Sequence, residues 1–358
     1  MRPLWAASFE SARFRLMRKL RVLIMMDEAL VPPASVEGMS AGDIAPFKTE
    51  HDVLTALREL GHEVEVVGVK TELAVLSDAI AAIRPNVCFN LVEDFNGIPS
   101  RDQHVVSYLE LINQPYTGAN PRGLTLARDK ALTKKVLSYH GIRVPRFVTF
   151  PLGRPVRPTA SLQFPLLVKS LTEEGSVGIA QASVVHTADE LIERVTFLHE
   201  KHATDAIAEQ YIEGRELYVG VLGNRKLQTL PIWELCLENL PADSARIATA
   251  RVKWDESYRT RHGIISKAAI DLPVAVSRHI SELAREAYRA LDLTGYARID
   301  LRLTPQGEVF LIEANPNPQI ARNEDFADSA AAAGIDYPTL LQRILTLGMN
   351  YQPLGLAA

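Results

Sequence analysis

Residues 297–315 form the part of the sequence best suited to chemistry. Polar and apolar residues alternate on both sides of a turn signal at residues 304–307, which predicts two β-strands joined as a hairpin. With the last two of these turn residues at the tip, Asp300 falls opposite Glu313. Directly opposed carboxylates repel each other, and a divalent cation between them removes that cost. Mg²⁺ prefers such hard oxygen ligands together with nucleotide phosphates.

The same register places Arg298 opposite Asn315. Asn315 adds a carbonyl oxygen to the ligand set, and Arg298 is suited to hold a phosphate or a developing oxyanion. A solvated hairpin with its polar face in water would also alternate, but it predicts scattered charge of either sign. We therefore favour a magnesium site made by Asp300, Glu313 and Asn315.

A glycine-containing loop after Lys169 is the second candidate element. Gly175, Ser176, Val177 and Gly178 lie in it, and glycine lets backbone N–H groups approach phosphate oxygens closely. Lys169 adds a point charge for the same phosphates. By itself the loop is weak evidence, because an ordinary turn has the same composition.

The third candidate element is the segment 209–216. Backbone groups beside an apolar pocket can recognise adenine, and a carboxylate can accept hydrogen bonds from ribose hydroxyls. Glu209, Gln210, Ile212 and Glu216 fit those roles, although a charged linker has a similar sequence.

The elements that position these residues fall into three regions. In residues 18–120, short apolar strands alternate with helical patterns, which predicts a Rossmann-like domain with a parallel sheet. The expected strands are 21–26, 64–69 and 87–92, and the expected helices are 50–60 and 73–83. This region has no G-x-G-x-x-G after its first strand, and the chain has no G-x-x-x-x-G-K-[ST], which disfavours a dehydrogenase or a P-loop enzyme.

Residues 121–210 and 211–350 make the second and third regions. We expect one helix over 124–139 and strands at 147–150 and 166–169 in the second, and a helix over 273–291 in the third. Residues 1–17 are basic but lack the apolar core of a signal peptide, so we interpret them as a disordered extension.

Composition excludes several classes of protein. The chain has 358 residues, 47% of them hydrophobic, and a net charge of −4, which points to neither a nucleic-acid surface nor a membrane partner. No apolar run approaches the ~20 residues that span a bilayer. Two cysteines cannot form a disulfide framework, and they fit a cytoplasmic protein.

Taken in order, these motifs resemble the D-alanine–D-alanine ligase family of the ATP-grasp superfamily. The resemblance covers roughly residues 87–348. Its parts are LELINQPYTGA (109–119), DK (129–130), FPLLVKS…EEGSVGI (164–179), AEQYIEGRELYVGVLG (208–223), VKW (252–254) and GYARIDLRL…FLIEANPNP (295–318). The implied fold is α/β and α+β, an ATP-grasp fold preceded by a Rossmann-like (pre-ATP-grasp) domain.

The resemblance also implies a nucleotide site. Lys130, Lys169 and Lys253 would contact ATP phosphates, and residues 174–178 would close over them. Glu209, Gln210 and Ile212 would line the adenine site, with Glu216 on the ribose.

It implies the reaction as well. Asp300, Glu313 and Asn315 would bind two Mg²⁺, with Mn²⁺ as a substitute, and Arg298 would stabilise the acyl-phosphate and the tetrahedral intermediate. The reaction would join a small-molecule carboxylate to an amine at the expense of ATP. The family further implies a homodimer.

The substrate side departs from the family pattern. Gly175 replaces a serine, Trp254 replaces a tyrosine, and Glu324 falls near a serine that helps bind the acceptor carboxylate. The glutamate that holds the donor amine has no aligned counterpart, and Glu37 or Glu50 is the substitute we consider.

These departures leave three hypotheses open. The first is a ligase with a different substrate, whose acceptor carries a positive charge or lacks the carboxylate; alternatively Glu324 faces solvent and Arg322 takes the contact. The second is a genuine D-alanine–D-alanine ligase. The third is a non-catalytic ATP-binding module.

Overall fold

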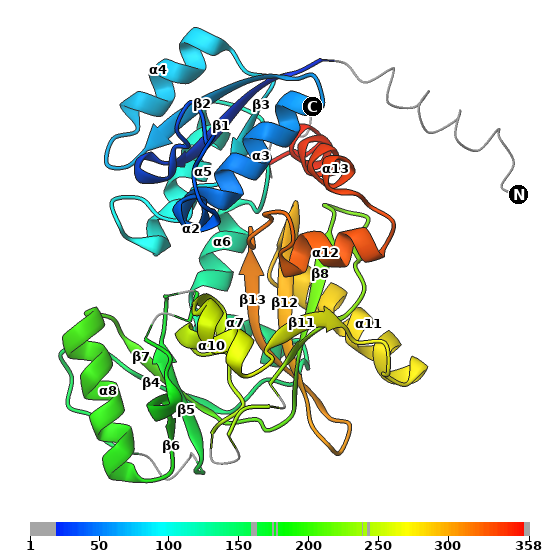
Figure 1. The fold of residues 1–358 in the computed structure, drawn as a ribbon. Coiled ribbons are helices and arrows are strands. Elements are labelled where there is room, and N and C mark those ends of the chain that lie inside the picture. Colours follow the sequence, from blue (N-terminus) through cyan, green and yellow to red (C-terminus); the bar gives the residue numbers. More distant parts are fainter. Residues whose placement is uncertain are drawn as a thin grey trace, which may run out of the picture.

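Three β-sheets follow one another along the chain (Figure 1). The computed structural model describes residues 19–158, 163–173, 175–176, 178–237, 239–241 and 244–353. The proposed extension over residues 1–17 lies outside the described residues, and so does Val177 of the glycine loop.

The N-terminal sheet is parallel, with strand order β2-β1-β3. Its helices connect successive strands, so the expected Rossmann-like alternation is confirmed. The elements of this part are β1 (Arg21–Asp27), η1 (Glu28–Leu30), α2 (Ala41–Ile44), η2 (Ala45–Phe47), α3 (Lys48–Glu59), β2 (Glu63–Val69), α4 (Ala74–Ile83), β3 (Val87–Asn90), η3 (Pro99–Arg101) and α5 (Asp102–Leu111).

The expected helix over residues 124–139 is two helices, α6 (Pro121–Arg128) and α7 (Lys130–Tyr139). Asp129 has an extended backbone and separates them, and its carboxylate accepts from the N–H groups of Ala131 and Leu132. Asp129 is therefore an N-cap, a role that periodicity of apolar residues does not reveal. The break places Lys130 at the first position of a new helix.

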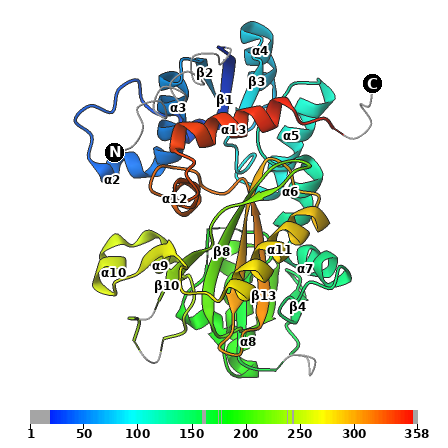
Figure 2. The same cartoon turned by 90° about the vertical axis from the view of Figure 1, so that its right-hand side faces the viewer.

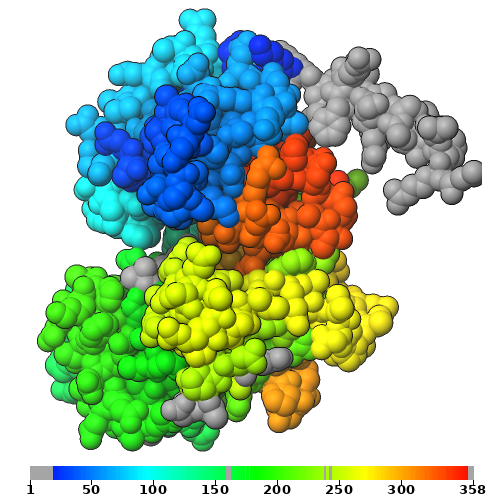
Figure 3. Space-filling model, viewed as in Figure 1, coloured from blue at the N-terminus to red at the C-terminus, as the bar shows by residue number. Residues whose placement is uncertain are grey.

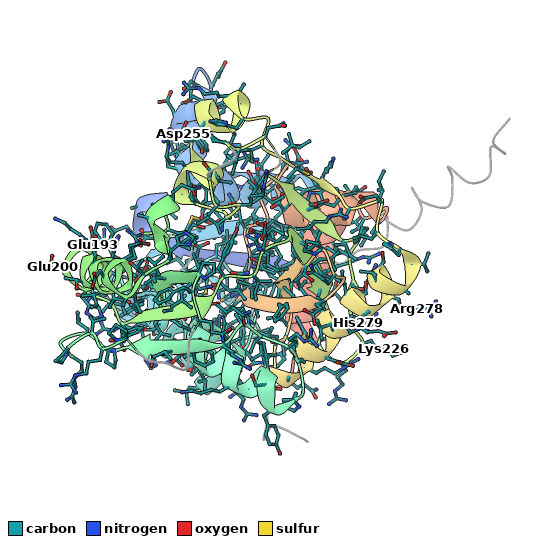
Figure 4. All side chains as sticks on the ribbon, turned by 90° about the horizontal axis from the view of Figure 1, so that it is seen from below. Glu193, Glu200, Lys226, Asp255, Arg278 and His279 are labelled. Carbon is teal, nitrogen blue, oxygen red and sulfur yellow. The ribbon has the colours of Figure 1, made fainter. Side chains whose placement is uncertain are left out.

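The central sheet is antiparallel, with order β4-β7-β5-β6. Its elements are β4 (Phe147–Phe150), β5 (Leu166–Ser170), η4 (Gln181–Ser183), β6 (Val184–Val185), α8 (Ala188–His202) and β7 (Ala206–Gln210). Helix α8 buries Leu191, Val195 and Leu198 against the sheet, while Glu193 and Glu200 point outward at the edge of the molecule (Figure 4). This one-sided pattern is what an amphipathic covering helix requires.

The C-terminal sheet has the order β11-β10-β8-β12-β13, and β9 pairs with β8. Its elements are β8 (Arg215–Leu222), β9 (Gln228–Thr229), β10 (Trp233–Cys236), α9 (Ala250–Trp254), α10 (Glu256–Arg261), β11 (Ile265–Ala268), α11 (Val274–Ala290), β12 (Tyr296–Leu303), β13 (Val309–Pro316), α12 (Asp325–Ala332) and α13 (Tyr337–Met349). The apolar stripe of α11, including Ile280 and Leu283, is buried, whereas Arg278 and His279 lie on its outer side (Figure 4).

The hairpin of β12 and β13 has the predicted register at the end that carries the candidate metal ligands. Asp300 pairs with Glu313, and Arg298 pairs with Asn315. The polar residues therefore converge across one β-ribbon, as their alternation indicates.

The tip of this hairpin differs from the prediction. Leu303 pairs with Val309, which centres the turn on Gln306 alone. A β-bulge then leaves Ile312 as an extra residue and shifts the pairing back before Asp300 is reached. The shifted turn and the bulge therefore offset each other, and the predicted pairing of Asp300 with Glu313 is correct.

Helix α13 packs on the N-terminal sheet, although it follows the C-terminal sheet in sequence. Its Leu341 and Leu345 share one apolar cluster with Val22 and Leu57. Figures 1 and 2 both show α13 beside α3, and the space-filling view shows the red residues against the blue ones (Figure 3). Helix α13 therefore packs the C-terminal part of the described chain against the N-terminal sheet.

None of the helices that the structure describes is both long enough and apolar enough to cross a lipid bilayer.

Candidate functional site

A pocket lies where the central and C-terminal sheets meet. Strands β5 and β7 contribute one wall, and β8, β12 and β13 contribute the other. Nine of the predicted site residues line it: Lys169, Ser176, Glu209, Gln210, Ile212, Glu216, Lys253, Asp300 and Glu313.

Five other predicted residues are not in the pocket wall. Lys130 and Arg298 stand directly behind it, where they contact Glu313 and Asp300. Asn315 donates a hydrogen bond to the backbone carbonyl of Arg298 at 3.4 Å.

The two glycines of the loop lie outside the wall as well. A Cβ at Gly178 would come within 3.0 Å of His202 and 3.1 Å of Leu198, so this glycine allows close packing on α8. Gly175 has φ +65° and its carbonyl accepts from the indole Nε1 of Trp254 at 3.0 Å.

Glu209 is shared by two buried lysines. Its carboxylate lies 2.7 Å from the Lys169 ammonium and 3.2 Å from that of Lys134. Burial favours the neutral acid, but Lys134 and Lys169 outweigh it and lower the pKa of Glu209. Burial lowers the pKa of Lys134 to about 8, and Glu209 opposes that shift. Glu209 therefore stays ionised inside the protein.

The two opposed carboxylates have different surroundings. Burial disfavours the charge on Glu313, but Lys130 and Lys169 outweigh it and hold the pKa of Glu313 well below its usual range. The Lys130 ammonium lies 3.2 Å from this carboxylate. Burial raises the pKa of Asp300, and Arg298 counteracts it through two hydrogen bonds of 2.7 and 2.9 Å.

The oxygen ligands present suit a magnesium ion. Asp300 and Glu313 face each other across the ribbon, and Asn315 supplies an amide oxygen two residues further along β13. Among the described residues no three Asp, Glu, His or Cys side chains gather as a metal cluster, so phosphate oxygens or water would complete the shell.

The glycine loop is tied to the segment that carries Lys253. The Ser176 hydroxyl donates to the Ala248 carbonyl at 2.7 Å, and the Ala250 N–H donates to the Ile179 carbonyl at 3.1 Å. Lys253 lines the pocket and forms no ion pair within the part of the chain that the structure describes. Its charge is therefore available to a ligand.

Several residues in the pocket wall or behind it have no role in the sequence analysis. Arg302 lines the pocket from β12, and it donates to the Glu216 carboxylate at 2.5 Å. Tyr218 donates to the same carboxylate at 2.8 Å. Ile247 and Ala248 come from a loop with no motif, so no local signal identified them. Lys134 carried a signal, since it follows Lys130 by one helical turn.

Glu50 is the better of the two candidates for the donor amine. Glu37 is exposed, whereas Glu50 is buried near the start of α3. Burial raises its pKa to about 7, with further contributions from Glu93 and Asp27. No basic side chain in the described ranges forms an ion pair with Glu50.

The structure does not support the alternative in which Glu324 faces solvent and Arg322 takes the acceptor contact. Glu324 does not simply face solvent, because its carboxylate lies 3.1 Å from the Lys48 ammonium. Arg322 stacks over Tyr337 at 4.4 Å and reaches Glu59 at 3.3 Å, so it is committed elsewhere.

Comparisons with known proteins agree with this geometry. The family model described as D-ala D-ala ligase C-terminus matches residues 136–346. The chain is 31% identical to the uncharacterized protein y4sG of Sinorhizobium fredii (strain NBRC 101917 / NGR234), over 82% of this chain and 85% of that protein. It is 30% identical to a D-alanine–D-alanine ligase of Desulforudis audaxviator, over 87% and 96%.

A crystal structure of D-alanine–D-alanine ligase from Bacillus anthracis complexed with ATP shares the fold. The TM-score is 0.71 at 22% identity, covering 92% of this chain and 97% of that one. The family model and the named relatives, together with this fold, identify an ATP-grasp enzyme that forms C–N bonds. The chain belongs to the D-alanine–D-alanine ligase-like family, whose members are ATP-dependent ligases that use Mg²⁺. The expected fold, enzyme class and cofactors are therefore confirmed.

Proposed function

We propose that this ligase activates a small-molecule carboxylate as an acyl-phosphate in the pocket between the central and C-terminal sheets. The observation that carries the proposal is the pairing of Asp300 with Glu313 beside a cluster of lysines. Cations around opposed carboxylates favour a ligand that brings both a metal and phosphates.

The nucleotide half of the pocket supports ATP binding. Lys130, Lys169 and Lys253 supply positive charge for the phosphates. Ile212 is buried among the wall residues, next to Gln210, and offers an apolar surface to a purine. Glu216 is oriented by Arg302 and Tyr218, which suits a carboxylate that accepts from ribose hydroxyls.

The oxygens of Asp300, Glu313 and Asn315 would hold Mg²⁺, which when bound neutralises charge on the transferred phosphoryl group. Arg298 lies beside Asp300 and points over the Tyr218 ring at 4.7 Å. Although burial disfavours its charge, Asp300 outweighs burial and raises the pKa of Arg298, so the guanidinium stays protonated.

The reaction follows in two steps. A carboxylate oxygen attacks the γ-phosphorus of ATP, which forms the acyl-phosphate and releases ADP. The amine then attacks the acyl carbon, loses a proton, and expels inorganic phosphate. Arg298 stabilises the oxyanion of the tetrahedral intermediate by charge-assisted hydrogen bonding.

We assign the donor's ammonium group to Glu50. Strands β1 and β3 are neighbours in the order β2-β1-β3, so the chain reverses its winding direction between them. Ligands of open parallel sheets bind outside the carboxyl ends of strands at this point. Asp27 ends β1 and Glu93 follows β3, and both act electrostatically on Glu50. The charges there favour a cationic group.

We further propose that the acceptor is not D-alanine. A helix N-terminus attracts anions, but Glu324 is the N-cap residue of α12, and Asp325 and Asp328 lie in its first turn. Lys48 is engaged by Glu324 and by the Arg322 carbonyl at 2.7 Å. An acceptor carboxylate would meet repulsion here, whereas an amine without a carboxylate, or with a second ammonium group, would not.

The test is ATP-dependent phosphate release over a panel of D- and L-amino acids, amines and peptides, with mass spectrometry of the products. D-alanine, D-alaninamide and a short diamine are compared as acceptors. We expect the two cations without a carboxylate to be preferred. Preference for D-alanine would refute the assignment and support the second candidate, a genuine D-alanine–D-alanine ligase, which its named relatives favour.

Two expectations of the resemblance accompany this proposal. A homodimer is tested by light scattering of the purified chain. A cytoplasmic location is tested by fractionation of cells that express it.

A further inference from the structure

Lys134 is a fully buried lysine that no part of the proposed reaction uses. It lies on α7 with 0% exposure, next to the exposed Lys135. Lysine is almost never fully buried unless it is paired, so its partners indicate its purpose.

The two partners of Lys134 belong to different sheets. Its ammonium donates to the Ile312 carbonyl on β13 at 2.8 Å. It also lies 3.2 Å from the Glu209 carboxylate on β7. Both Glu209 and Ile312 line the pocket, whereas Lys134 does not. Lys134 therefore supports two opposite walls from behind.

The two residues that contact Lys134, Ile312 and Glu209, each need its ammonium group for a different reason. Ile312 is the extra residue of the β-bulge, so its carbonyl lies where the strand pairing shifts, and Glu313 follows directly. Glu209 needs a positive partner to remain ionised in a buried place. Lys169 is its other partner, at 2.7 Å.

We propose that Lys134 is a positioning residue for the nucleotide. It fixes the Glu209 carboxylate and the bulge at Ile312, and it supplies part of the positive charge that Glu209 requires. The Lys169 ammonium is then available to a ligand instead of being fully committed to Glu209. This inference rests on the proposed nucleotide pocket.

Removal of the ammonium has a defined consequence. In Lys134→Met, Glu209 keeps only Lys169, and the Ile312 carbonyl loses its side-chain donor. We expect nucleotide affinity to fall, because the pocket wall and the charge of Lys169 both change. The chemical step has no contact with Lys134 and should be little affected.

The experiment compares Lys134→Met with Lys135→Met, which removes a neighbouring exposed ammonium from the same helix. Calorimetry with magnesium and a non-hydrolysable ATP analogue should show binding weaker by at least about tenfold for Lys134→Met and unchanged for Lys135→Met. In steady state the KM for ATP should rise, while kcat and the KM for the amine stay near wild type. Equal affinity in both variants would overturn the proposal.

Folding is controlled by circular dichroism and by a second variant, Lys134→Gln, which keeps N–H donors without the charge. A folded Lys134→Gln that binds as tightly as wild type would overturn the role of the charge. Failure of both variants to fold would also overturn the proposal, since Lys134 would then serve folding alone. Wild-type binding without phosphate release from any substrate pair would refute the ligase proposal while leaving this inference supported by calorimetry.

Discussion

The hydrogen bond from Trp254 to the glycine loop leads to a quantitative prediction. The indole Nε1 donates to the Gly175 carbonyl at 3.0 Å and links the loop to the helix that carries Lys253. Trp254→Phe removes the donor and keeps an aromatic ring. Because Trp254 is 64% exposed, we take the lower part of the usual range for a hydrogen bond, about 0.5–1 kcal/mol.

A free energy of that size corresponds to a factor of roughly two to five in an equilibrium constant. We expect the KM for ATP to rise by the same factor, measured by phosphate release at saturating concentrations of the other substrates. The matched control is Trp233→Phe. The Trp233 indole nitrogen is buried and has no hydrogen-bond partner within the described residues, so this variant removes an N–H without breaking a contact. An unchanged KM in Trp254→Phe, or the same rise in Trp233→Phe, would refute the reasoning.

Two further predictions concern stability. The raised pKa of Glu50, about 7, means that the folded state binds this proton more tightly than the unfolded state, so wild-type stability falls as pH rises from about 4.5 to about 7. Glu50→Gln should therefore gain up to about 3 kcal/mol over wild type at about pH 8 and nothing at about pH 4 in urea denaturation; equal gains at both pH values would contradict this. A Cβ at Gly348 would lie 2.4 Å from the Tyr116 carbonyl, where α13 meets the N-terminal part, so Gly348→Ala should lose about 1–3 kcal/mol. Gly42→Ala, whose nearest contact would be 3.7 Å, is the control, and a similar loss there would show that the contact is not the cause.

The sequence predicted which residues of the hairpin share its polar face, because alternation depends only on the two-residue period of a strand. It could not predict the bulge at Ile312, whose carbonyl accepts from Lys134, a residue far away in the chain. The correct pairing of Asp300 with Glu313 therefore came from two errors of one residue that cancelled.

The other features that the sequence did not predict also depend on contacts that apolar periodicity does not show. The break at Asp129 depends on a cap, which a helical period spanning both sides conceals. The pair of Lys48 with Glu324 joins residues from distant elements, and nothing local to either residue indicates it. Lys134 follows Lys130 by one helical turn, but only the fold shows that it lies between two sheets.

The most direct test of the account is magnesium-dependent nucleotide binding by wild type, Asp300→Asn and Glu313→Gln, measured by calorimetry with a non-hydrolysable ATP analogue. We predict that magnesium strengthens binding to wild type and that both variants lose this dependence while they remain folded. Wild-type affinity that is the same with magnesium and with EDTA would contradict the claim that Asp300 and Glu313 form a metal site.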